Sequence, residues 1–128
     1  MSWKSSRLAL CAIGVLHALF MLGELYKWDS PLIMEAVLEK WPPYPLVLSP
    51  VDSQFTVAVV HNAGIYNGIV AVALFAAASL GRSGFSVQVA LLAGGIVAGV
   101  FGAATLTSLT IVQAILGAIA LAWIIYKK

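Results

Sequence analysis

Long runs of hydrophobic residues alternate with short polar links along the chain, and four of these runs have the length of a membrane span. They cover residues 8–26, 53–80, 86–106 and 109–126. A transmembrane helix needs about 20 predominantly apolar residues. The pattern therefore predicts an all-α membrane protein with four transmembrane helices, in which residues 1–128 form one membrane domain.

The links between the last three runs are very short. Only Gly81 to Gly84, around Arg82, separates the second run from the third, and only Thr107 and Ser108 separate the third from the fourth. Links of this length force consecutive helices to lie antiparallel. The expected architecture is an antiparallel four-helix bundle.

The link between the first two runs, residues 27–52, is longer and has a pattern of its own. Apolar positions recur at helical spacing in residues 32–41, opposite charged side chains. This is typical of a short amphipathic helix that lies in the membrane interface, with its tryptophans at headgroup depth. Four prolines follow and predict an extended segment until Asp52 or Ser53 caps the second span.

Composition favours lipid over water as the solvent of this chain. Hydrophobic residues make up 62% and charged residues 9% of the sequence, and the mean hydropathy is +1.00. Soluble domains contain roughly a quarter charged residues. The net charge is only +2 and the basic residues form no stripe, so we expect no nucleic-acid partner. The single cysteine, Cys11, excludes an intrachain disulfide and is expected to be a small buried residue.

Lysine and arginine predict the orientation of the bundle. Five of the seven lie at the two termini and in the turn around Arg82, whereas two lie in the acidic segment 27–52. Cytoplasmic loops carry the excess of basic residues. Both termini are therefore expected in the cytoplasm and segment 27–52 outside.

Polar side chains within the apolar runs are the candidate site residues, because they are costly in lipid and usually face the bundle interior. His17 and Glu24 are seven residues apart, so they share one face of the first helix. The other candidates are His61, Asn62, Tyr66 and Asn67 on the second run, Thr105 on the third and Gln113 on the fourth. The predicted topology puts most of them in the outer half of the bilayer, whereas the inner half is built of Ala, Val, Leu, Ile and Gly.

We interpret this set as an acid–base site for a lipophilic small molecule, of isomerase or cyclase type, with no cofactor. Loss of water favours the neutral carboxyl, which donates a proton, and the neutral imidazole, which accepts one. The expected catalytic residues are His17, Glu24 and His61. The expected substrate-binding residues are Asn62, Tyr66, Asn67, Thr105 and Gln113, of which Asn62 and Tyr66 share a face and Asn67 points elsewhere.

Each candidate also has a structural alternative. Glu24 could be a headgroup-level carboxylate. His17, His61 and Asn67 could make interhelical hydrogen bonds. Thr105 and Gln113 could bond to backbone at helix ends.

Three other functions are open. His17, Glu24 and His61 are acceptable metal ligands, although no two histidines lie three or four residues apart on one helix. A small proton-coupled transporter also places a carboxylate in its first span. The third alternative is a non-catalytic subunit or assembly factor of a membrane complex, in which the polar residues only hold helices together.

Pairs of small residues four positions apart predict close helix packing, within the chain or in a homo-oligomer. These pairs are Gly64 and Gly68, Gly95 and Gly99, and Ala98 and Gly102.

The order of the polar and glycine motifs resembles one family. The motifs are His17-x6-Glu24, then Asn62-Ala63-Gly64-Ile65-Tyr66-Asn67-Gly68, then the stretch from Ala98 and Gly99 to Thr105, and finally Val112-Gln113. They resemble the bacterial domain-of-unknown-function family numbered thirteen hundred and four. The resemblance implies a small four-helix protein of the bacterial cytoplasmic (inner) membrane, whose partners include membrane lipid, and it implies no particular reaction.

Overall fold

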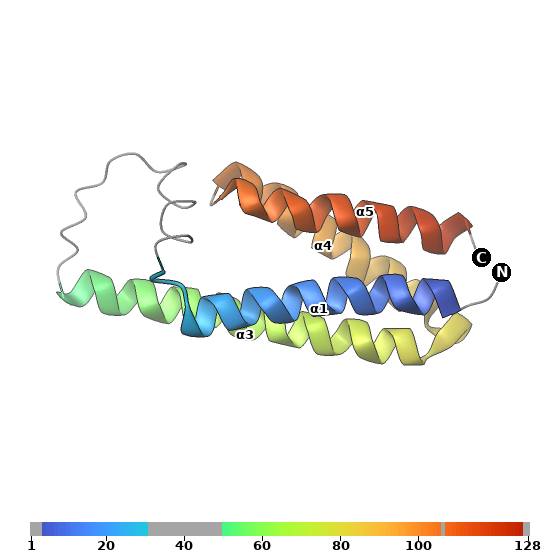
Figure 1. Ribbon diagram of the computed structural model, residues 1–128, viewed down its shortest axis with the longest axis horizontal. Coiled ribbons are helices and arrows are strands. Elements are labelled where there is room, and N and C mark those ends of the chain that lie inside the picture. Colours follow the sequence, from blue (N-terminus) through green and yellow to red (C-terminus); the bar gives the residue numbers. More distant parts are fainter. Residues whose placement is uncertain (1–3, 31–49, 106, 127–128) are drawn as a thin grey trace.

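The chain folds into a bundle of long helices. The computed structural model describes residues 4–30, 50–105 and 107–126, and within these ranges it contains helices and no strand (Figure 1). The helices are α1 (Lys4–Tyr26), α3 (Pro50–Ser79), α4 (Phe85–Thr105) and α5 (Ile111–Tyr126), with short 3-10 turns at Gly81–Gly84 and Ser108–Thr110. In the described residues, four helices are long and apolar enough to cross a membrane. The predicted all-α membrane fold with four spans is confirmed.

The segment between the first two spans differs from its prediction at one boundary. The predicted amphipathic helix at residues 32–41 lies outside the described residues. The second span begins at Pro50, earlier than the predicted cap at Asp52 or Ser53. The physical reason is that proline fits the first turn of a helix, where its missing N–H has no partner to lose.

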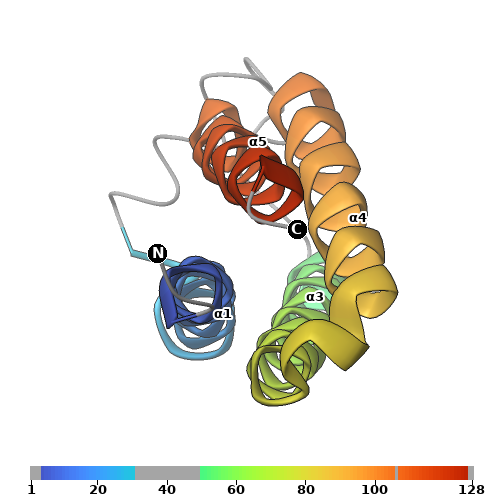
Figure 2. The same cartoon turned by 90° about the vertical axis from the view of Figure 1, so that its right-hand side faces the viewer.

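The four helices form two antiparallel pairs, α1 with α3 and α4 with α5 (Figure 2). The pairs approach each other most closely toward the end that holds both termini (Figure 1). The buried apolar core lies toward that end and consists of Leu10, Ile13, Leu74, Ala78, Leu92, Ala120 and Ile124. The polar candidates therefore lie at and beyond the edge of this core.

Glycines let α3 lie directly against α1. A β-carbon at Gly64 would lie 3.1 Å from Leu25 Cγ and 3.2 Å from Glu24 Cβ. A β-carbon at Gly68 would lie 2.6 Å from Met21 Sδ. This packing brings side chains of α3 within hydrogen-bond distance of α1.

Helices α4 and α5 also approach each other closely, and side-chain hydrogen bonds connect them. A β-carbon at Gly99 would lie 2.7 Å from the Ala114 backbone nitrogen. The hydroxyl hydrogen of Thr110 is shared between the Thr107 carbonyl (2.9 Å) and the Gly99 carbonyl (3.2 Å). Gln113 Nε2 donates to the Gly95 carbonyl (2.9 Å). Side chains of the 3-10 turn and of α5 thereby reach carbonyls of α4 inside an apolar hairpin.

The half of the bundle near the termini is not purely apolar, contrary to the prediction. Gln88 and Ser6 are buried there. Gln88 Nε2 donates to the carbonyls of Ala77 (2.8 Å) and Gly81 (2.9 Å). Its nitrogen thereby satisfies one carbonyl in the last turn of α3 and one in the following 3-10 turn. Its oxygen, Oε1, is buried without a hydrogen-bond partner among the described residues.

Candidate functional site

Three side chains form a hydrogen-bonded chain between α1 and α3. His17 Nδ1 lies 2.8 Å from Asn67 Oδ1, and Asn67 Nδ2 donates to Glu24 Oε2 at 2.7 Å. His17 is buried, whereas Glu24 and Asn67 are half-buried. Asn67 thus joins the two polar residues of the first span through one amide group.

Helix geometry explains how one asparagine reaches both partners. His17 and Glu24 are seven residues apart, so they lie on the same face of α1, about 10 Å apart along its axis. Asn67 lies on the face of α3 that contacts α1, three residues after Gly64 and directly before Gly68. The close approach at these glycines lets a short amide side chain bridge two turns of the neighbouring helix.

The bridge also fixes where the hydrogen of the imidazole lies. Asn67 Oδ1 can only accept a hydrogen bond, so His17 Nδ1 is the donor. In a neutral imidazole the other nitrogen, Nε2, is then an acceptor. The ring is further held by Phe20, whose ring contacts it edge to face with centroids 6.3 Å apart.

The second ring nitrogen of His17, Nε2, takes no part in the hydrogen bonds with Asn67 and Glu24. His17 is 3% exposed, and its Nε2 has no hydrogen-bond partner within the part of the chain that the structure describes. It lies beside Gly95 of α4, as does the amide of Gln113 on α5. An unpaired buried acceptor is costly, on the order of 1–3 kcal/mol, so a hydrogen-bond donor placed beside this atom would be stabilised.

Four other predicted site residues lie outside this cluster. Asn62 and Tyr66 are exposed, His61 is half-buried, and Thr105 is exposed with Oγ1 donating to the Phe101 carbonyl at 2.7 Å. Each residue turns a helix by about 100°, so Asn62 lies about 140° around α3 from Asn67. No hydrogen bond joins the first three to His17, Glu24 or Asn67 among the described residues.

The role of Asn67 differs from its expected position. Helical spacing separates it from Asn62 and Tyr66, which share another face of the helix. The structure gives it the central position because α3 presents the stripe of Gly64, Gly68 and Ala71 to its neighbours. The position of Asn67 within this stripe of small residues was the signal that could have identified it.

The described residues offer no metal centre. Among them, no three side chains of His, Cys, Asp or Glu lie close enough together to hold a metal ion. The alternative of a metal bound by His17, Glu24 and His61 therefore has no ligand set in this part of the chain.

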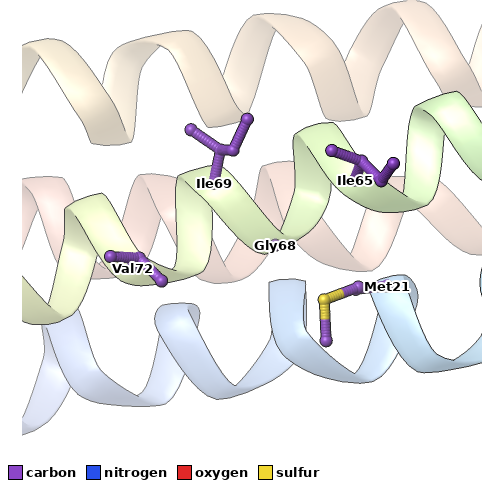
Figure 3. A pocket seen from close by; sticks show the side chains of 5 residues that line it. All are labelled: Met21, Ile65, Gly68, Ile69 and Val72. Carbon is purple, nitrogen blue, oxygen red and sulfur yellow. The ribbon is translucent and has the colours of Figure 1, made fainter.

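An apolar groove runs along the exposed side of the same helix pair. It has a volume of about 390 Å³ and is lined by Met21 of α1 and by Ile65, Gly68, Ile69 and Val72 of α3 (Figure 3). None of the three hydrogen-bonded side chains lines it. Met21 is nevertheless four residues from His17 and three from Glu24. The groove and the hydrogen-bonded side chains therefore lie along the same two turns of α1.

The fold and the site define a multi-pass membrane protein with a hydrogen-bonded His–Asn–Glu chain between its first two spans. Residues 11–125 match the family described as "Protein of unknown function (DUF1304)". The chain belongs to this family. Comparison with curated proteins gave no match, and neither did comparison with solved structures.

Proposed function

We propose that this protein carries out acid–base chemistry, of isomerase or cyclase type, on a lipophilic small molecule in the bilayer. One observation carries the proposal: the buried, unpaired Nε2 of His17, held as an acceptor by the Asn67–Glu24 bridge. A positioned neutral imidazole is the most common general base in proteins. Its depth in the bundle restricts its partners to apolar molecules.

In the proposed reaction, His17 Nε2 takes a proton from one atom of the substrate and becomes an imidazolium. Its Nδ1–H stays bonded to Asn67, and the nearby Glu24 carboxylate stabilises the positive charge through the same bridge. The imidazolium then returns a proton to a second atom of the substrate. Atoms and charge balance over the cycle, so no oxidant, reductant or co-reactant is required.

Glu24 is proposed to connect the site with water. It lies two residues before the end of α1 and is half-buried. A carboxyl at this position can exchange protons with the surface, while the buried His17 cannot. The Asn67 amide does not itself relay protons, so in the proposed reaction the Nε2 proton of the imidazolium must exchange with the Glu24 carboxyl when the bridge opens. This exchange would introduce solvent hydrogen into the product.

Deuterium uptake tests this reaction. Protein in nanodiscs made from a bacterial membrane lipid extract is incubated in D2O, and mass spectrometry follows deuterium bound to carbon in each lipophilic component. We expect at least one component to gain deuterium, and His17→Gln to lower the rate by about 10²–10⁴-fold, the usual contribution of a general base. Glutamine keeps a donor for Asn67, so folding is preserved.

Two further variants make the result specific. Glu24→Gln keeps the acceptor for Asn67 Nδ2 but cannot exchange a proton, so it should also lower deuterium uptake. Cys11→Ser changes the other reactive side chain of α1 and should leave uptake unchanged. If no component takes up deuterium in a manner that depends on His17, the chemistry is wrong, and the subunit or assembly role becomes the better explanation of the polar chain.

The proposed orientation places both termini in the cytoplasm of a bacterium and the end of α1 outside, as the lysine and arginine pattern favours. The exposed residues Asp29 and Ser83 lie at opposite ends of the bundle. In a Cys11→Ser background, Asp29→Cys should react with a membrane-impermeant maleimide in intact cells. Ser83→Cys should react only after lysis. Equal labelling of both before lysis would contradict a single orientation.

A further inference from the structure

A polar niche lies where α1, α4 and α5 meet, beyond the edge of the apolar core. A β-carbon at Gly95 would lie 3.8 Å from His17 Nε2 and 3.9 Å from Gln113 Nε2. Both side chains are more than nine-tenths buried, with His17 3% and Gln113 6% exposed. One nitrogen from each helix pair therefore lies near the position that a side chain at Gly95 would occupy.

The two nitrogens have opposite hydrogen-bonding roles. His17 Nε2 is an acceptor because the ring hydrogen lies on Nδ1, bonded to Asn67. Gln113 Nε2 carries two hydrogens and donates one of them to the Gly95 carbonyl at 2.9 Å. The second hydrogen on Gln113 Nε2 can be donated to another acceptor. The niche thus has one acceptor and one donor, each within 4 Å of the position of a β-carbon at Gly95.

A hydroxyl group matches both roles with a single oxygen atom, since it donates one hydrogen and accepts through its lone pairs. A ketone or ether would pair with Gln113 but leave His17 Nε2 without a donor. A carboxylate or ammonium would place an unpaired charge among apolar helices, which is far more costly than a neutral group. We propose that the niche of His17, Gly95 and Gln113 binds the hydroxyl group of a lipophilic alcohol. This inference rests on the proposed function in that the same His17 nitrogen serves as the base.

The chain supplies a matched pair of variants for this niche. A methyl group at Gly95 would enter it at ordinary contact distance from both nitrogens, so Gly95→Ala fills the niche without forcing its neighbours apart. A methyl group at Gly94 would meet no atom within 4 Å. Both substitutions change glycine to alanine in the same turn of α4, so their effects on helix propensity cancel in the comparison.

The test uses 1-dodecanol as the probe and dodecyl methyl ether as its counterpart, which lacks the hydroxyl hydrogen. Protein labelled with 15N-histidine in nanodiscs is titrated with each, and the His17 Nε2 resonance is assigned by its loss in His17→Gln. Dodecanol should shift this resonance in the native protein and in Gly94→Ala. Gly95→Ala should require at least about tenfold more dodecanol, as expected when one methyl group blocks a fitted site.

Comparing the responses to dodecanol and to dodecyl methyl ether shows whether the hydroxyl hydrogen is recognised. An equal shift with dodecyl methyl ether would overturn the inference, as would an unchanged dodecanol response in Gly95→Ala or no response in the native protein. The outcome is separate from deuterium uptake. Dodecanol binding without uptake would leave the alcohol site standing and remove the proposed chemistry, and uptake without dodecanol binding would do the reverse.

Discussion

Asn67→Leu is expected to lower the free energy of unfolding by about 1–3 kcal/mol, because it leaves buried partners unsatisfied. Leucine has nearly the same shape as asparagine, so the packing of α1 against Gly64 and Gly68 is kept. The substitution removes both hydrogen bonds at once, and His17 Nδ1 and Glu24 Oε2 lose their partner. Reversible unfolding in mixed micelles, driven by added sodium dodecyl sulfate, measures the change.

Asn62→Leu is the matched control for this variant. It makes the same substitution on the same helix, at an exposed position, and should change the free energy of unfolding by less than about 0.5 kcal/mol. Asn67→Leu should also reduce deuterium uptake, because His17 is no longer held with its hydrogen on Nδ1. Equal costs for the two leucine variants would show that the bridge contributes nothing measurable to the fold.

The helices could be predicted from the sequence because a single physical requirement determines them. A span of apolar residues must hydrogen-bond its own backbone in lipid, so the runs at residues 86–106 and 109–126 predict α4 and α5 almost to the residue. The start of α3 was less well predicted. A proline such as Pro50 is compatible with an extended segment and with the first turn of a helix, and local sequence does not decide between them.

The candidate site was harder to predict, because it depends on how far each helix is rotated. The seven-residue spacing of His17 and Glu24 fixed their common face, and the structure brings both into one chain. On α3, helical spacing favours Asn62 and Tyr66 as site residues because they share a face. The glycines on the opposite face decide the rotation instead, since only that face can approach α1 closely.

The two buried glutamine side chains, Gln88 and Gln113, have similar backbone hydrogen bonds but different neighbours. Gln88 and Gln113 are both buried and both donate to backbone carbonyls across a hairpin. Gln88 uses its nitrogen for two carbonyls, whereas the structure gives Gln113 one such bond beside His17. The proposed ligand-binding role of Gln113 therefore depends on its neighbouring side chain, His17, which sequence spacing does not reveal.

Gly99→Leu is expected to cost about 3 kcal/mol, at the upper end of the range for overpacking, because its neighbours are backbone atoms. A β-carbon there would lie 2.7 Å from the Ala114 nitrogen and 3.0 Å from the Thr110 carbonyl oxygen. A helix backbone cannot move aside as a side chain can, so α4 and α5 must separate. Separation would lengthen the Thr110–Gly99 and Gln113–Gly95 hydrogen bonds and widen the niche proposed to bind an alcohol.

Gly94→Leu controls for the effect of adding a leucine to α4, since a β-carbon at Gly94 meets no atom within 4 Å. Unfolding in mixed micelles should show a cost for Gly99→Leu and little or none for Gly94→Leu. Gly99→Leu should also weaken the dodecanol response at His17, because Gln113 moves with α5. If both leucines are tolerated equally, α4 and α5 do not pack through Gly99, and the position assigned to Gln113 beside His17 is wrong.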